Sequence, residues 1–152
     1  MGIDVETEIT IERPRREVAA YVADPDNATE WYANIESVEW KSPKPLAVGS
    51  RLEFVAHFLG RTISYTYEVK ENDDAERFVM ATTDGPMQME TTYSWSDAPA
   101  QKTRMRLRNR GEPSGFSTLF TPIMSRAVRR ANEKDLRRLK EILERGPESQ
   151  ME

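Results

Sequence analysis

Apolar and polar residues alternate at the start of the chain, which is the period of a β-strand with one solvated face. The residues between the apolar positions are acidic or threonine. This pattern predicts a first strand over residues 3–11. The positions on its apolar side are Ile3, Val5, Thr7, Ile9 and Ile11.

Two short helical segments are expected after this strand. Pro14 favours the first turn of a helix, because its missing N–H would have no partner there. Asp24-Pro25 ends this helix, and a second helical turn is predicted over 26–31. Extended structure then returns over 35–41.

A β-hairpin is predicted around Leu59-Gly60 if these two residues form a tight turn. This register places apolar and aromatic residues opposite one another on one face and a charged pair on the other face. Each cross-strand pair of this kind contributes roughly 0.2–1 kcal/mol. The predicted pairs are Phe58 with Arg61, Ala56 with Ile63, Phe54 with Tyr65, Leu52 with Tyr67, and Arg51 with Glu68.

Two further turns extend the predicted meander. A tight turn at Asp84-Gly85 joins two strands, and a looser turn over 97–102 leads to the last strand, in which apolar residues alternate with arginines. The pairs predicted for the first turn are Thr82 with Met87, Met80 with Met89, and Phe78 with Thr91.

A long amphipathic helix is predicted from Thr121-Pro122, an N-cap followed by a first-turn proline, to about Arg145. The element order is therefore strand, two short helices, six strands and a long helix. It predicts a single α+β domain over 1–145, in which a curved seven-stranded antiparallel sheet wraps the last helix. The tail, 146–152, is expected to be disordered.

Composition narrows the function. The net charge of −4 has the wrong sign for a nucleic-acid partner, so none is expected. With no cysteine and one histidine, neither a metal site nor a thiolate nucleophile is expected, and we expect no cofactor. No run approaches the roughly 18–20 apolar residues that span a bilayer. The chain is therefore expected to be cytoplasmic, without an integral membrane segment.

The chain resembles the START-like (SRPBCC) superfamily, and specifically its polyketide cyclase/dehydrase and lipid-transport branch, over about residues 3–144. The resemblance implies a helix-grip fold with a cavity between the sheet and the long helix. Members include lipid carriers, hormone receptors and cyclases, so it does not imply one reaction. The residues that carry it are Ile11-Glu12-Arg13-Pro14, Val18, Tyr21-Val22, Asp24-Pro25, Trp31, Val48-Gly49, Leu59-Gly60-Arg61, 65–69, Gly85-Pro86, Leu136 and Leu139-Lys140.

Candidate ligand-binding residues are the aromatic and methionine side chains that share the inward parity of the predicted sheet. Trp31 at the end of the second short helix, and residues just before or in the first part of the long helix, complete the set. Simple core packing is the alternative for each of them. Tyr65, Tyr67 and Tyr93 also carry hydroxyls that could orient a ligand oxygen. The full set is Trp31, Phe54, Phe58, Tyr65, Tyr67, Met80, Met89, Tyr93, Trp95, Met105, Phe120, Met124 and Val128.

Asp135 is the candidate catalytic residue, because it falls inside the apolar sector of the last helix, with Asn132 near the margin of that sector. Facing a cavity, its carboxyl would have a raised pKa and could act as a general base for enolisation or dehydration. The alternative is a boundary ion pair with Arg138. His57 has outward parity, opposite Thr62, and is expected at the surface or the rim.

Arginines alternate along the last predicted strand. They could form an anionic-ligand patch, but a charge ladder is favoured, because the first strand would bring acidic residues beside them. Glu90 is also predicted to lie opposite Arg108. The arginines are Arg104, Arg106, Arg108 and Arg110, and the acidic residues are Asp4, Glu6, Glu8 and Glu12.

Three functions remain open. The leading one is binding of a small hydrophobic ligand, such as a lipid, a polyketide or an aromatic metabolite, in a cavity between the sheet and the last helix. The second is an aromatase/cyclase or dehydratase that acts on a polyketide-like substrate. The third is a protein-interaction module, which a filled interior would favour. The protein is expected to be a monomer or a homodimer.

Overall fold

The computed structural model describes residues 3–58, 60–73, 75–84, 88–112 and 121–150. None of the helices in these ranges combines the length and the apolar character needed to cross a bilayer.

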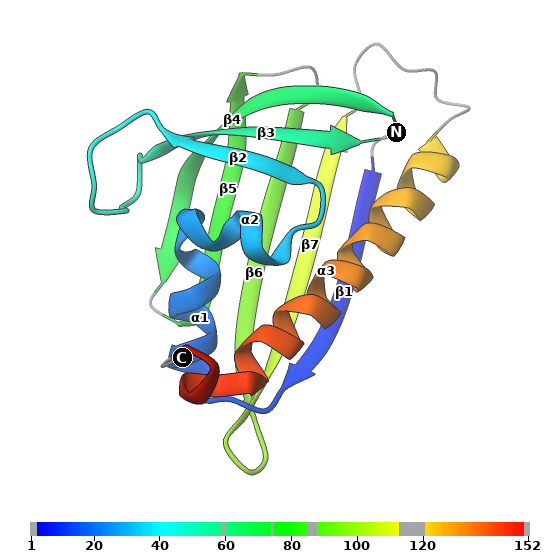
Figure 1. Ribbon diagram of the computed structural model, residues 1–152. Coiled ribbons are helices and arrows are strands. Elements are labelled where there is room, and N and C mark those ends of the chain that lie inside the picture. The colour runs from blue at the N-terminus through cyan, green and yellow to red at the C-terminus, as the bar shows by residue number, and fades with distance from the viewer. Residues whose placement is uncertain (1–2, 59, 74, 85–87, 113–120, 151–152) are drawn as a thin grey trace.

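A seven-stranded antiparallel sheet curves around one long helix (Figure 1). The strand order is β1-β7-β6-β5-β4-β3-β2, so the first strand lies beside the last one. This arrangement confirms the predicted α+β helix-grip architecture. The elements are β1 (Ile3–Ile11), α1 (Arg15–Ala23), the 3₁₀ helix η1 (Pro25–Asn27), α2 (Ala28–Trp31), β2 (Ile35–Trp40), β3 (Arg51–Phe58), β4 (Arg61–Asp73), β5 (Arg77–Asp84), β6 (Gln88–Ala98), β7 (Lys102–Glu112) and α3 (Thr121–Gln150).

The β3–β4 hairpin has the register that the sequence predicts. Phe54 pairs with Tyr65 and Arg51 pairs with Glu68, and the other predicted pairs also form. Arg51 Nε donates to Glu68 Oε1 at 3.3 Å. Only two residues separate the strands, so this short connection excludes the registers shifted by two residues, which would place the apolar sets on the same face as well.

The β5–β6 register differs from the prediction by two residues. Met80 pairs with Thr91 instead of Met89, and Phe78 pairs with Tyr93 instead of Thr91. A shift by two residues keeps every side chain on its predicted face, since side chains alternate with a period of two. The hydrophobic pattern therefore cannot detect such an error. Met87 of the third predicted pair, with Thr82, lies outside the described residues.

The charge ladder forms between β1 and β7. Arg108 binds both carboxylate oxygens of Asp4, at 2.9 and 2.7 Å, and Glu8 pairs with Arg104 and Arg106. Glu90 lies opposite Arg110 instead of the predicted Arg108, and forms an ion pair with it at 2.7 Å. The predicted partner of Glu90 is again wrong by two residues, here in the pairing of β6 with β7. Exposed pairs of this kind stabilise a fold only slightly, so the ladder mainly neutralises the arginines.

Helix α3 extends to Gln150, beyond Arg145 where the predicted helix ends. These helix bounds do not test the prediction that the tail, residues 146–152, is disordered. Residues 151–152 lie outside the described residues.

Helix α3 packs along β1, an edge strand of the sheet. An edge strand has backbone groups without a strand partner, and buried ones need another partner. Arg129 Nη1 donates to the Glu6 carbonyl oxygen at 3.0 Å, and Lys140 Nζ donates to that of Thr10 at 2.9 Å. Long cationic side chains of the helix therefore bind two backbone carbonyl groups of β1.

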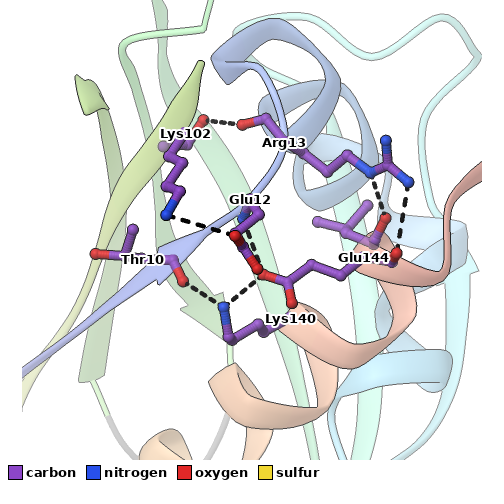
Figure 2. A network of polar contacts seen from close by, with 8 residues as sticks. Thr10, Glu12, Arg13, Lys102, Lys140 and Glu144 are labelled. Atoms are coloured by element: carbon purple, nitrogen blue, oxygen red, sulfur yellow. Dashed lines mark hydrogen bonds and ion pairs between the residues drawn. The ribbon is translucent and has the colours of Figure 1, made fainter. Parts of the chain in front are cut away.

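A polar network joins the C-terminal half of α3 to the segment between β1 and α1 (Figure 2). Arg13 Nε donates to the Leu143 carbonyl oxygen at 2.8 Å. The Glu12 N–H donates to Glu144 Oε2 at 2.8 Å, and Lys140 Nζ binds the same carboxylate oxygen. Arg13 also accepts at its carbonyl oxygen from Thr103 Oγ1 at 2.7 Å. This network fixes the helix end against both β1 and β7.

Substituting Glu144→Ala should destabilise the fold by about 1 kcal/mol, because the Glu12 N–H and Lys140 lose their acceptor. Burial opposes ionisation of Glu144, but Lys140 and the Glu12 N–H outweigh it and lower its pKa below 4.5. The stabilisation is therefore present above about pH 4.5 and is lost as the pH falls through the folded-state pKa. Urea unfolding at several pH values measures both effects.

Glu141→Ala is the matched control, since Glu141 is exposed on the same helix. Its cost should stay within about 0.5 kcal/mol. Equal costs for the two variants, or a Glu144→Ala cost that does not fall in acid, would contradict the role of the network.

Candidate functional site

A cavity of about 130 Å³ lies between the inner face of the sheet and α3, with α2 forming a further wall. Most of its lining is apolar or aromatic, with a few polar groups, as is usual for small-molecule sites. Strands β3 to β7 provide most of the floor, and α3 provides Met124, Val128, Ala131, Asn132 and Asp135 opposite them. The polar lining residues are Asn34, His57, Thr91, Asn109, Arg110, Asn132 and Asp135.

Most of the predicted ligand-binding residues line this cavity. They come from α2, from four consecutive strands and from the first half of α3. Phe120 lies outside the described residues, as does the side chain of Phe58. The predicted residues in the lining are Trp31, Phe54, Tyr65, Tyr67, Met80, Met89, Tyr93, Met124 and Val128.

Trp95 and Met105 have the predicted inward parity but do not line the cavity. They pair across β6 and β7, and both are buried in the main hydrophobic core. Helix α1 packs on these two strands, so core packing fills this end of the sheet. Strand parity identifies the face of a residue, whereas its position along the strand decides whether the face is packed or open.

Three aromatic side chains of β3 and β4 form one wall. The ring centroids of Phe54 and Tyr65 are 5.7 Å apart, and those of Tyr65 and Tyr67 are 5.2 Å apart with the planes nearly perpendicular. Such contacts are worth about 0.5–1.5 kcal/mol beyond the burial of apolar area. These contacts therefore stabilise the wall beside the cavity.

The tyrosine hydroxyls in the lining are mostly paired with protein groups. Tyr67 Oη and Thr91 Oγ1 are 2.7 Å apart, and Thr91 donates to Asn109 Oδ1 at 2.6 Å. Tyr93 Oη and Tyr32 Oη are 2.5 Å apart. Burial raises the pKa of Tyr67 to about 12 and raises the pKa of Tyr32, Tyr65 and Tyr93 as well. All four phenols therefore stay protonated near neutral pH.

Asp135 lines the cavity and is only 3% exposed. Its Oδ1 accepts from the Ala33 N–H at 3.1 Å, which ties α3 to the end of α2. Burial raises the pKa of Asp135 to about 6, against the opposing effects of the Ala33 N–H and of Lys134. The alternative ion pair is not formed, because Arg138 donates instead to the Glu30 carbonyl oxygen at 2.6 Å.

Sequence reasoning missed some polar residues of the site. Asn109 shares the inward parity of Leu107, so strand alternation could have identified it. Thr91 was placed on the correct face but was not considered a cavity residue. Tyr32 follows the last residue of α2, where neither helical nor strand periodicity says which way a side chain points.

His57 lies at the rim of the cavity and is exposed. Its Nδ1 lies 3.0 Å from Thr62 Oγ1, and its Nε2 lies 3.0 Å from Glu36 Oε2. The predicted place at the surface or rim is confirmed. Within the described ranges, no three histidine, aspartate or glutamate side chains are grouped so that they could hold a metal ion.

The chain matches the family described as "Polyketide cyclase / dehydrase and lipid transport" over residues 2–144. It therefore belongs to this family of the START-like superfamily. No curated protein matches it by sequence.

Solved structures share the fold at low sequence identity. The Zhui aromatase/cyclase from Streptomyces sp. R1128 is 16% identical, with a TM-score of 0.80 and 95% of each chain covered. A START superfamily protein from Mycobacterium smegmatis is 12% identical, with a TM-score of 0.80, covering 93% of this chain and 97% of that one. A protein from Thermus thermophilus is 21% identical, with a TM-score of 0.79 and coverages of 91% and 94%. At these identities the likeness establishes the fold alone.

The raised pKa of Asp135 should appear in the pH dependence of stability. Between its ordinary value of 3.8 and about 6, the unfolded chain releases the proton that the folded protein still holds. Stability is therefore lost as the pH rises through this window and stays constant above it. Asp135→Asn removes this loss, so its advantage over the wild type should grow by about 2–3 kcal/mol between about pH 4 and pH 7.

Urea unfolding across this range measures the difference. Glu133→Gln, a change at an exposed position two residues away on the same helix, is the control and should show no such trend. A constant difference between Asp135→Asn and the wild type would show that the carboxyl is not desolvated.

Proposed function

We propose that this protein binds a small hydrophobic ligand, of the lipid, polyketide or aromatic-metabolite class, in the cavity between the sheet and α3. The aromatic lining of this cavity is the observation that carries the proposal. Membership of a family described by both polyketide cyclisation and lipid transport supports it.

The size of the cavity favours a ring or a short chain as the buried part of the ligand. An engineered apolar cavity of about 150 Å³ in another protein binds benzene. The cavity here is similar, at about 130 Å³, and its methionines Met80, Met89 and Met124 can adapt to irregular shapes. A closed, filled interior would have favoured a protein-interaction module, so the cavity favours a small-molecule ligand over that alternative.

An aromatase/cyclase or dehydratase is the second candidate, and Asp135 is the observation that favours it. A pKa of about 6 leaves this carboxyl ionised at neutral pH yet basic enough to accept a proton. Oδ1 is held by the Ala33 N–H, so Oδ2 is the atom that could remove a proton α to a substrate carbonyl. The electron pair of that C–H bond would then form the enolate. A structure similar to an aromatase/cyclase supports this candidate as an analogy only.

A larger side chain that fills the cavity should weaken ligand binding without creating a void. Ala131 lines the cavity from α3, so Ala131→Phe should weaken binding of the fluorescent apolar probe N-phenyl-1-naphthylamine by about tenfold or more. Ala127 lies one helical turn earlier, has intermediate exposure and is not part of the lining. Ala127→Phe is therefore the matched control and should bind like the wild type.

Fluorescence titration measures the affinities, and circular dichroism checks that both variants are folded. Equal affinity in the wild type and both variants would place the probe elsewhere and contradict the assigned site.

The catalytic candidate makes a separate prediction. If Asp135 is a general base, Asp135→Asn should slow cyclisation of a linear poly-β-ketone probe by about 10²-fold or more. The wild-type rate should rise with pH through about 6, since only the ionised carboxylate accepts the proton. Absorbance of the aromatic product gives the rate. Turnover that survives the substitution would remove Asp135 from the mechanism, and the absence of wild-type turnover would favour a carrier.

A further inference from the structure

The Asp135 carboxyl has one oxygen without a hydrogen-bond partner among the residues that the structure describes. Oδ1 accepts from the Ala33 N–H at 3.1 Å, whereas no described group donates to Oδ2. Oδ2 is also not among the unpaired polar atoms that their surroundings enclose completely, as Trp31 Nε1 and Asn132 Nδ2 are. Since Asp135 lines the cavity and is otherwise buried, Oδ2 opens onto the cavity.

Aromatic side chains beside Asp135 show where in the cavity this oxygen lies. Tyr32 comes just before Ala33 in the chain, and its hydroxyl oxygen lies 2.5 Å from that of Tyr93. The charge of Asp135 contributes to the raised pKa of both phenols, which places the carboxyl near the two hydroxyls. The ring centroid of Trp31 lies 4.0 Å from that of Tyr32 and 5.9 Å from that of Tyr93. The carboxyl therefore borders a group of three aromatic rings, all from residues that line the cavity.

No cation of the protein pairs with this carboxyl among the described residues. Arg138 donates to the Glu30 carbonyl oxygen at 2.6 Å, and the Glu30 carboxylate binds the Tyr21 hydroxyl. Lys134 is exposed and acts on Asp135 only through its charge. Burial raises the pKa of Asp135 to about 6, so the carboxyl is still mostly ionised at neutral pH. The cavity wall thus carries a buried negative charge without a partner, which is costly in the free protein.

The other titratable side chains in the described lining do not supply the missing positive charge. Arg110 pairs with Glu90 at 2.7 Å, and His57 Nε2 lies 3.0 Å from Glu36 Oε2. The phenols stay protonated and neutral, because burial raises the pKa of each one. They are Tyr32, Tyr65, Tyr67 and Tyr93.

We propose that Asp135 Oδ2 binds the protonated amine of a ligand with a ring-sized apolar part. The assignment rests on the proposed binding function and narrows its ligand class to amphiphilic amines. An ammonium group has three N–H donors and no acceptor, so it can donate to Oδ2 and still has donors for nearby hydroxyl oxygens. Aromatic ring faces also attract a cation. A ligand carboxylate would be repelled, and a carbonyl oxygen would meet an acceptor instead of a donor.

This role of Asp135 differs from that of a general base. A ligand cation stabilises the ionised carboxyl and lowers its pKa, so the carboxyl accepts a proton less readily while the ligand is bound. The assignment therefore belongs with the binding function and not with the catalytic candidate.

The test compares 2-aminoindane with indan-2-ol, which share a ring skeleton and carry an ammonium group and a neutral hydroxyl group. Isothermal titration calorimetry at about pH 7.5 measures both affinities, and we expect 2-aminoindane to bind at least about tenfold more tightly. Asp135→Asn removes the charge but keeps an acceptor for the Ala33 N–H, so it should abolish this preference. Glu133→Gln removes an exposed negative charge from the same helix. It is the matched control and should keep the preference.

The pH dependence of binding gives a second test that needs no variant. The amine stays protonated between about pH 5 and pH 7.5, whereas Asp135 takes up a proton as the pH falls through about 6. The affinity for 2-aminoindane should therefore fall about tenfold from about pH 7.5 to about pH 5, and that for indan-2-ol by less than about threefold. His57→Gln should keep this fall, and Asp135→Asn should lose it.

Equal affinity of the wild type for the two probes, without the fall in acid, would overturn the amine assignment and leave the proposed binding function standing. A preference for 2-aminoindane that survives in Asp135→Asn would also overturn the assignment, because the cation would then bind elsewhere. Binding of neither probe would overturn both the assignment and the proposed binding function.

Discussion

The structure depends on how α3 is held against the curved sheet. The helix has large apolar side chains toward both ends of its described length and small or polar ones between them. Leu136, Leu139 and Leu143 belong to the main core, while Met124 and Val128 pack with β1 in a second cluster. Ala131, Asn132 and Asp135 lie between these two groups and line the cavity, as Met124 and Val128 also do. The large apolar residues toward both ends of α3 therefore hold the helix at a distance from the sheet at which the smaller side chains between them leave a cavity.

Polar contacts maintain this spacing. Lys140 and Glu144 join α3 to β1, and Asp135 and Arg138 join it to the backbone around α2. Because these contacts use backbone carbonyl and N–H groups, they fix the position of the helix without filling the interior. The cavity is thus a consequence of how α3 is held against the sheet. The same arrangement leaves the Asp135 carboxyl buried, which lowers stability, a cost often found at functional sites.

The face of each strand residue could be predicted, but the register of two strand pairs could not. Two residues separate β3 from β4, so the pairing of Phe54 with Tyr65 follows directly from the short connection. At β5–β6 and β6–β7 the connections are longer, and the predicted partners of Met80 and Glu90 were wrong by two residues. Since such a shift preserves the face, the set of inward residues was still largely correct. Trp95 and Met105 show the limit of this reasoning, because parity does not say which part of a face another element covers.

The sequence by itself determined the element order, the inner face of the sheet and the apolar stripe of α3, because strand and helix periods are local properties of the chain. It also placed Asp135 within that stripe. Only the tertiary structure decided that Arg138 turns to the Glu30 carbonyl and that Asp135 is held by Ala33. It also decided that Trp31 Nε1 and Asn132 Nδ2 have no acceptor among the described residues. Whether a polar group is paired depends on residues about a hundred positions away in the chain, and this long-range geometry is set only when helix and sheet pack together.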